Sequence, residues 1–301
     1  MNSRLFNAAA VGLKGAGKTT YLAALWNLLE ETDSGGDAQR PCVRLAQMQP
    51  DREYLQSIRG AWLDLENAQR TSLAVTPRIE LALEISESAD MVTLSVPDLS
   101  GETFSAQWET RQATHAYASL AAALDGVLLF VNSTAAGRHN RIVPAKARPA
   151  GSVSDGSNVS AASPPVQEPT EDSHKPFSAA MTQPQVQLVE CLQFVSFLRS
   201  HARPIRVAVI VSAWDLVGKA MRPSEWVERR LPLLYQYLQV QSSVRDFAFF
   251  GVSAQGGRWP EDRERLQDEP AILRPYLVEQ DERTGDLARP IHWLVSANDN
   301  G

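Results

Sequence analysis

Strongly apolar stretches alternate along this chain with stretches whose apolar residues recur at helical spacing. The stretches DGVLLFVNS and RPIRVAVIVSAWD are almost continuously apolar, which is typical of parallel strands covered on both faces. The whole pattern predicts strands at residues 4–11, 42–48, 78–85, 91–97, 125–132, 205–212 and 247–252, and helices at residues 18–31, 51–67, 106–123, 185–201, 224–240 and 289–297. Such alternation predicts an α/β fold.

One part of the pattern departs from a purely parallel sheet. The stretches RIELALEI and MVTLSVPD are separated only by the polar turn SESAD, so we expect them to pair as an antiparallel hairpin. The predicted fold is therefore α/β with a mostly parallel sheet and one antiparallel edge strand.

Residues 135–182 differ in composition from the rest of the chain. They are rich in Ser, Ala and Pro and poor in large apolar residues, so they cannot bury enough surface to offset the entropy of ordering. We interpret them as a disordered insertion. An interdomain linker is the alternative, but the apolar strands on both sides read as parts of one sheet. We therefore expect a single domain over residues 1–301.

Composition and charge exclude several classes of protein. A formal net charge of −6 argues against a general nucleic-acid or anionic-membrane binder. The chain has no apolar stretch of about 18 residues, so no transmembrane helix is expected, and its N-terminal apolar run is too short for a signal peptide. Cys42 and Cys191 lack metal-ligand spacing, and we expect reduced thiols in a cytoplasmic protein.

The sequence GLKGAGKT, between the first predicted strand and the first predicted helix, has the spacing G-x-x-x-x-G-K-T. Its glycines let backbone N–H groups turn toward phosphate oxygens, at the positive N-terminus of a helix. Lys18 can reach the β- and γ-phosphates, and the hydroxyl of Thr19 can bind Mg²⁺. The nucleotide-binding candidates in this loop are Gly12, Lys14, Gly15, Ala16, Gly17, Lys18, Thr19 and Thr20.

A second candidate motif, VPDLSGETF, follows the predicted hairpin. Asp98 can hold Mg²⁺ through water, and the N–H of Gly101 can sense the γ-phosphate. Asp and Gly are also common turn formers, which is the alternative interpretation. The position of this motif after a phosphate loop and a hairpin favours the functional interpretation.

Two further motifs stand at the ends of predicted strands. In VAVIVSAWD, the carboxylate of Asp215 can accept hydrogen bonds from N1 and N2 of guanine, although an Asp after a strand is often a helix cap. In FFGVSAQGG, a backbone N–H can reach the guanine O6. The candidates here are Ser253, Ala254 and Gln255, and Ser212 belongs to the preceding motif.

With these motifs in order, the chain resembles GTPases of the Ras-like, translation-factor-related class over nearly its whole length, apart from the insertion. More narrowly, VSAWD, GVSAQGG, TQPQVQLVECL and LARPIHWL are similar to the bacterial double-GTPase family of conflict and signalling systems. The resemblance implies a Ras-like three-layer α/β/α fold, GTP or GDP as ligand, Mg²⁺ as cofactor, and GTPase-associated partner proteins.

Two positions depart from that resemblance. Ala213 stands where the fourth motif usually has a lysine that covers the base, and the adjacent Trp214 either packs near the base or is a buried structural residue. Glu102 stands where a water-orienting glutamine is common, so intrinsic hydrolysis should be slow. The catalytic candidates are Lys18, Gly101, Glu102 and Lys14, the last being either a cation near a partner's phosphates or a solvated side chain.

The first switch region is expected to be elaborate. An added strand and helix, at about residues 36–70, separate the first helix from the strand RIELALEI. The switch threonine, a candidate Mg²⁺ ligand with Thr19 and Asp98, is either Thr71 or Thr76, and we favour Thr71. The spacing of Tyr54, Leu55, Ile58, Trp62 and Leu65 is helical; core packing is the expected role and a partner-binding face the alternative.

Together these features predict a Mg²⁺-dependent GTP-binding and GTP-hydrolysing switch. We expect it to act with a second GTPase or as a homo-oligomer, together with an effector protein, and not with nucleic acid. The alternatives are a nucleotide-dependent scaffold with negligible hydrolysis, and an ATPase.

Overall fold

The computed structural model describes residues 5–33, 40–46, 49–65, 78–88, 90–97, 102–134, 182–199, 204–218, 221–258 and 260–296, with the side chains of Asp33 and Glu102 excepted. Several sequence predictions fall outside these residues: Thr71, Thr76, Asp98, Gly101 and nearly all of the expected insertion at 135–182. Those predictions stay predictions.

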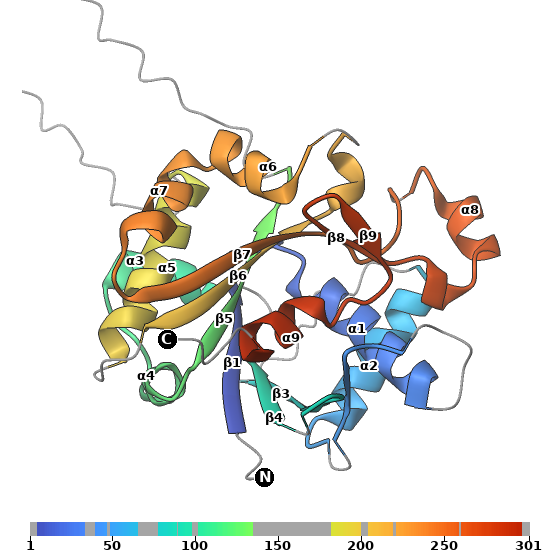
Figure 1. Cartoon of the computed structure of the whole chain (residues 1–301), viewed down its shortest axis with the longest axis horizontal. Coiled ribbons are helices and arrows are strands. Elements are labelled where there is room, and N and C mark those ends of the chain that lie inside the picture. Colours follow the sequence, from blue (N-terminus) through green and yellow to red (C-terminus); the bar gives the residue numbers. More distant parts are fainter. Residues whose placement is uncertain are drawn as a thin grey trace, which may run out of the picture.

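One sheet organises the described residues, with the strand order β2-β3-β4-β1-β5-β6-β7-β8-β9 (Figure 1). Its five central strands are parallel: β4 (Met91–Val96), β1 (Leu5–Gly12), β5 (Gly126–Asn132), β6 (Ile205–Ser212) and β7 (Val244–Ser253). The remaining strands are antiparallel to their neighbours: β2 (Val43–Leu45) and β3 (Ile79–Ile85) at one edge, and β8 (Tyr276–Glu279) and β9 (Glu282–Thr284) at the other.

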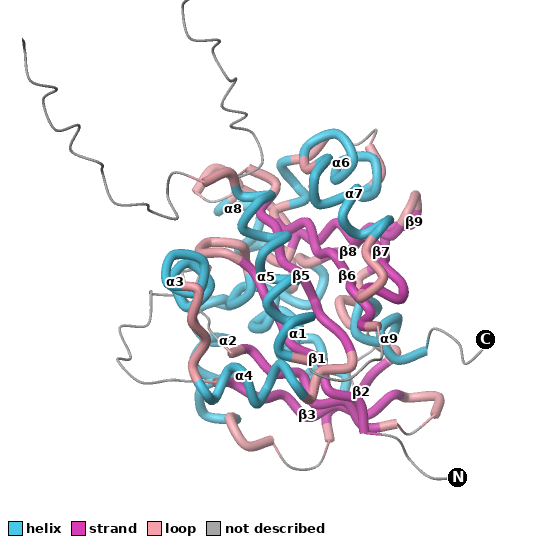
Figure 2. The backbone as a smooth tube through the Cα atoms, turned by 90° about the vertical axis from the view of Figure 1, so that its left-hand side faces the viewer, coloured by secondary structure: helices cyan, strands magenta, loops and turns pink. Residues whose placement is uncertain are grey.

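Helices cover both faces of this sheet, and Figure 2 shows the strands running together among them. One core joins the sheet to α1 (Lys18–Asp33), α2 (Arg52–Leu63) and α9 (Arg289–Ser296). The other joins it to α3 (Glu102–Thr110), α4 (His115–Ala122), α5 (Pro184–Leu198), α6 (Pro223–Arg230) and α7 (Pro232–Val240). Successive residues of the parallel strands alternate between the two cores, as the two-residue period of a strand requires. The three-layer α/β/α fold with a mostly parallel sheet is thereby confirmed.

Three details of the predicted sheet and helices were wrong. Antiparallel strands occur at both edges and not at one, because β8 and β9 add a second hairpin after β7. The predicted helix at 224–240 is two helices, since Pro232 has no N–H to donate and disfavours a helical Leu231.

The predicted helix at 106–123 is also divided. Arg111 adopts a left-handed conformation with φ 56° after α3, and the Thr114 hydroxyl then accepts a hydrogen bond from the Tyr117 N–H at 3.2 Å to cap α4. Local capping therefore ends one helix and starts the next within a single apolar pattern.

The added helix α2 has the packing that its spacing predicted. Leu55, Ile58 and Trp62 are buried in the core that contains α1, and Tyr54 is packed against it. The core-packing interpretation is confirmed for these four side chains. Leu65 is buried too, but it follows the end of α2 and has a left-handed backbone, with φ 55°. α2 lies against α1, which ties the added segment to the helix that follows the phosphate loop.

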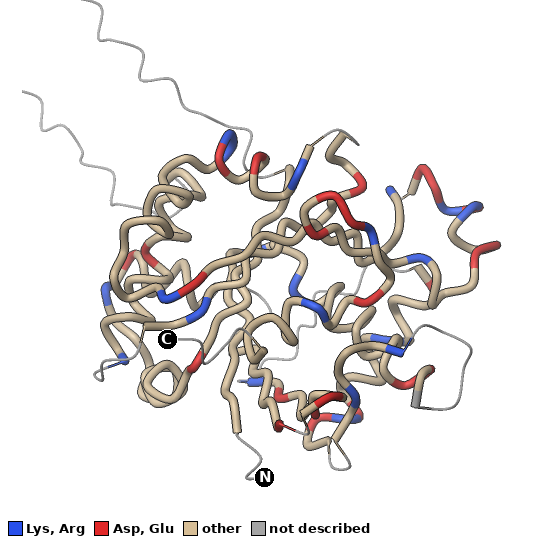
Figure 3. The backbone as a smooth tube through the Cα atoms, viewed as in Figure 1, with Lys and Arg blue, Asp and Glu red and all other residues tan. Residues whose placement is uncertain are grey.

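The surface mixes both signs of charge. Figure 3 shows basic and acidic positions interspersed over the described backbone in that view. Among the described residues, no helix combines the length and the apolar character that crossing a membrane would require.

Candidate functional site

The register of the parallel strands brings the predicted motifs to one edge of the sheet. Gly12 at the end of β1 pairs with Phe130 of β5, Asn132 at the end of β5 pairs with Ser212 of β6, and Ser212 pairs with Val252 of β7. The phosphate loop and the loops after β5, β6 and β7 therefore meet, at the place where open α/β sheets bind ligands.

The phosphate loop needs glycine at two positions for different reasons. Gly15 and Gly17 both have a positive φ, of 72° and 87°, which side chains with a Cβ rarely adopt. Around Gly15 the space is open, whereas a Cβ on Gly17 would lie 2.9 Å from the side chain of Ser212. Gly17 thus lets the loop approach β6, where the fourth motif begins.

Lys18 is held at the mouth of this loop. Its side chain is buried, and its Nζ donates hydrogen bonds to the carbonyl oxygens of Gly12 at 2.6 Å and Leu13 at 3.3 Å. The Phe104 ring lies 5.8 Å from the same ammonium. A buried, positioned cation at the start of a helix is suited to bind phosphate oxygens.

Asn132 braces the loop and was missed by sequence reasoning. Its Nδ2 donates to the Gly15 carbonyl oxygen at 2.9 Å, while its Oδ1 accepts from the N–H and hydroxyl of Thr134. The available signal was a polar residue ending the apolar stretch DGVLLFVN, next to a predicted phosphate loop in the sheet.

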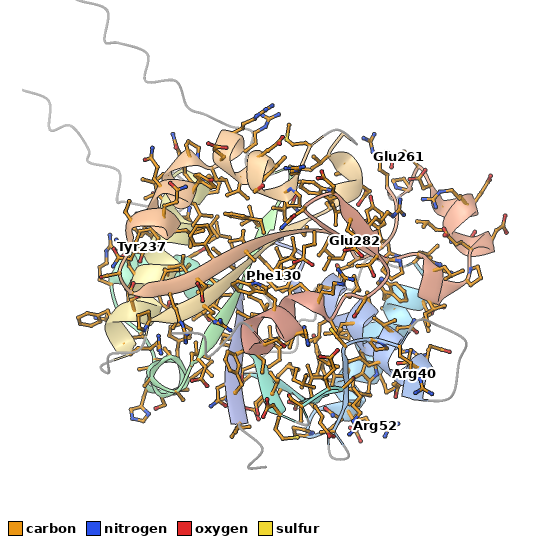
Figure 4. The ribbon with its side chains drawn as sticks, in the orientation of Figure 1. Arg40, Arg52, Phe130, Tyr237, Glu261 and Glu282 are labelled. Carbon is orange, nitrogen blue, oxygen red and sulfur yellow. The ribbon has the colours of Figure 1, made fainter. Side chains whose placement is uncertain are left out.

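A cavity of about 560 Å³ joins the phosphate loop to the two later motifs, a volume typical of small-molecule sites. It is lined by Gly15, Gly17, Thr20, Asn132, Ser212, Ala213, Asp215, Leu216, Ala254, Gln255, Gly257, Arg258 and Glu261. Figure 4 labels Glu261 on the loop that follows β7. Seven predicted nucleotide-binding residues are thus brought together, namely Gly15, Gly17, Thr20, Ser212, Asp215, Ala254 and Gln255.

Other predicted residues do not line this cavity. Lys14 is exposed and, with Ala16, borders a different hollow whose walls include Pro184 and Leu231. Gly12 is buried, where a Cβ would lie 2.7 Å from the Phe130 carbonyl oxygen. Gly12 therefore serves close packing of β1 on β5, next to the start of the loop.

Asp215 and Ser253 connect the fourth and fifth motifs. The fully buried Ser253 hydroxyl donates to Asp215 Oδ1 at 2.6 Å and accepts from the Gly256 N–H at 3.2 Å. Within the described residues no cation forms an ion pair with Asp215. Its carboxylate is thus oriented by a neutral group and keeps acceptor capacity toward the cavity.

Trp214 is a structural residue, which decides between its two predicted roles. The side chain is buried in the core that contains α6 and α7, and a Cβ on Gly251 of β7 would collide with its ring. It anchors the short helix η3 (Trp214–Leu216) that carries Asp215. The preceding Ala213 is left-handed, with φ 51°.

Two polar groups in the cavity wall have no partner in the described structure. Ser212 Oγ and Gln255 Nε2 are buried, and neither has a hydrogen-bond partner among the described residues. Buried polar atoms are usually paired, so unpaired atoms that line a cavity point to a polar ligand there.

The metal candidates are only partly described. Thr19 is half-buried in the first turn of α1, beside Lys18. Asp98 and Thr71 lie outside the described residues, as does the side chain of Glu102 at the start of α3. Among described residues, no group of three or more His, Cys, Asp or Glu side chains could hold a metal ion.

A family model described as Double-GTPase 1 matches residues 9–294. No curated protein matches the chain. Among solved structures, the chain is similar to the Saccharomyces cerevisiae Ski7 GTPase-like domain bound to GTP, with 14% identity and a TM-score of 0.42. That match covers 85% of this chain and 44% of the other.

Proposed function

This chain belongs to the Double-GTPase 1 family, and we propose that it is a Mg²⁺-dependent switch that binds GTP and hydrolyses it to GDP. The observation that carries the proposal is the cavity in which the phosphate loop and Asp215 face the same space. A phosphate cradle at one end and a base-reading carboxylate at the other support a nucleoside triphosphate as ligand.

Asp215 supports guanine as the base. A carboxylate can accept hydrogen bonds from N1–H and N2–H₂ of guanine together, and the Ser253 hydroxyl orients it for this. Adenine would turn its N1 acceptor toward the same carboxylate, leaving two acceptors face to face. Ala213 cannot cover the base as a lysine would, so ATP is the comparison ligand that tests this assignment.

Mg²⁺ would be held by the phosphates together with Thr19, Asp98 and Thr71. Hydroxyl and carboxylate oxygens are the hard ligands that this ion prefers, and Thr19 stands directly after Lys18. When bound, the ion would neutralise negative charge that develops on the phosphate oxygens. Lys18 and the loop N–H groups would hold those oxygens in place.

Hydrolysis would be slow in the isolated chain. Glu102, in place of a water-orienting glutamine, brings a carboxylate that the γ-phosphate repels, while the Gly101 N–H would contact that phosphate. We propose that the missing catalysis comes from a second GTPase, or a second copy, packed over the nucleotide face near Lys14. Such a pair would report to an effector in a bacterial signalling or defence system.

A nucleotide-dependent scaffold with negligible hydrolysis is the second candidate, and Glu102 is the residue that favours it. The two functions share the ligand and differ in turnover. They are therefore separated by one set of measurements on the same preparation.

The test measures affinity for GDP, GTP and ATP by calorimetry, with and without Mg²⁺, and phosphate release over a range of protein concentrations. We expect guanine nucleotides to bind roughly a hundredfold more tightly than ATP, and Mg²⁺ to strengthen GTP binding. Slow hydrolysis that accelerates with concentration supports the switch, and undetectable turnover at all concentrations supports the scaffold. Preference for ATP would refute the base assignment.

A further inference from the structure

The added helix α2 contacts the loop that carries the fifth motif. Trp62, in the last turn of α2, is 2% exposed, and its indole Nε1 donates a hydrogen bond to the Ala254 carbonyl oxygen at 3.1 Å. Ala254 and Gln255 line the proposed nucleotide cavity, whereas Trp62 does not. Trp62, in the segment expected to form switch I, thus contacts the loop proposed to bind the base, and does so outside the cavity.

Arg274 makes a second connection at the same place. Its Nη1 donates to the Leu63 carbonyl oxygen at 3.3 Å, and its guanidinium lies 6.0 Å from the centre of the Trp62 ring. Its own carbonyl packs so closely on Gly256 that a Cβ there would collide with it. The end of α2, Arg274 and residues 254–256 therefore form one packed unit, behind the wall of the cavity.

The Trp62 hydrogen bond also sets the orientation of the Ala254–Gln255 peptide bond. In a trans peptide the carbonyl and the following N–H point in opposite directions. Because the Ala254 carbonyl is held toward Trp62, the Gln255 N–H points to the other side, where both residues line the cavity. Among the described residues this N–H has no acceptor. It is one of the backbone donors of this loop that could meet the O6 of a guanine base, and the one whose peptide Trp62 holds.

We propose that Trp62 is a positioning residue for base recognition: its indole N–H fixes the Ala254–Gln255 peptide so that the Gln255 N–H faces the base. The added helix of the switch I segment thereby controls how long the nucleotide stays bound. This inference rests on the proposed guanine-nucleotide function and adds a residue that acts through the peptide, without touching the ligand.

The test is Trp62→Phe, which keeps a buried aromatic ring and removes the N–H. We expect GDP affinity to fall roughly threefold to tenfold, the size of one lost hydrogen bond, mainly through faster dissociation. The second ligand is 6-thioguanosine diphosphate, which keeps N1–H and N2–H₂ but has a sulfur, a weak acceptor, in place of O6. Its affinity should fall less than about twofold.

Trp26→Phe is the matched control. Trp26 is buried in the same core, at 1% exposed, and its indole Nε1 has no hydrogen-bond partner among the described residues. The same chemical change there should leave affinity for both ligands unchanged. Thermal unfolding of both variants separates a loss of stability from a loss of base contact.

Three results would overturn the inference: unchanged GDP affinity in Trp62→Phe, an equal loss for GDP and the thio analogue, or an equal loss in Trp26→Phe. If Trp62→Phe does not fold, 3-benzothienylalanine at position 62 keeps the ring size without the N–H, and the same comparison applies. Wild-type protein that binds no guanine nucleotide would instead refute the proposed function itself.

Discussion

Replacing Gly17 by alanine should damage the phosphate loop more than the same change at Gly15, and the structure supplies the reason. Both glycines have a left-handed φ, of 87° and 72°. Holding an alanine there costs about 1–2 kcal/mol. At Gly15 nothing lies within 4 Å of the added Cβ, so this backbone term is the whole effect.

At Gly17 a second term is added. The new methyl group would lie 2.9 Å from the Cβ and Oγ of Ser212, closer than real Cβ contacts, and Ser212 is held at the end of β6 by its pairing with Val252 of β7. Overpacking of this kind costs about 1–3 kcal/mol. We therefore expect Gly17→Ala to lower the free energy of unfolding by about 2–5 kcal/mol, against about 1–2 kcal/mol for Gly15→Ala.

The assay is urea unfolding of both variants, with nucleotide affinity measured on the folded protein. Adding Ser212→Gly to Gly17→Ala should remove the close contact and recover the stability that it costs. The cost of holding an alanine in the left-handed conformation should remain. Equal destabilisation by the two alanine variants, or no recovery in the double variant, would refute the reasoning that Gly17 is required for the approach to β6.

Three further predictions concern single residues of the site. Lys18→Ala should abolish measurable nucleotide binding in calorimetry while thermal unfolding stays cooperative, because the ammonium, which donates to the carbonyl oxygens of Gly12 and Leu13, is proposed to bind the phosphates. Unchanged affinity would refute the assignment. Asp215→Asn keeps an oxygen to accept from Ser253 but should lose roughly a hundredfold in GDP affinity and gain xanthosine diphosphate binding; no gain for xanthine would show that Asp215 is not the base reader. Lys14→Ala should reduce the concentration-dependent part of GTP hydrolysis. The control is Arg229→Ala, which removes an exposed cation on α6 and should leave that rate unchanged. A fast rate that depends on neither protein concentration nor Lys14 would contradict the partner model.

The elements with a strong local signal could be predicted from sequence. The apolar run of β6 (Ile205–Ser212) was predicted with its observed bounds, and α1 and β5 to within about two residues. β5 and β6 are buried at nearly every position and therefore read as continuous apolar runs, and α1 follows directly after the phosphate-loop motif. β8 and β9 could not be predicted, since strands of four and three residues are too short to show a period.

The parts of the site that were missed depend on contacts between distant residues. Asn132 bonds to Gly15 across 117 positions of sequence, and Trp62 bonds to Ala254 across 192. Nothing near either residue in the sequence indicates its partner, and the tryptophan spacing predicted only that it would be buried. Asp215 was predictable because the fourth motif is local; the Ser253 hydroxyl that orients it became visible only in the folded chain.

The two ends of the sheet have a consequence for how this protein can associate. The outermost strands, β2 and β9, are three residues long and carry charged side chains, including Arg44, which pairs with Glu84 of the adjacent strand, and Glu282, which pairs with Arg289. Short, charged margins offer little backbone for a neighbouring molecule to extend by strand addition. Growth into fibrils or continuous intermolecular sheets is therefore disfavoured at both borders. A second copy or a related GTPase would therefore have to meet this chain through side chains on a face of the domain, and not by extending its sheet.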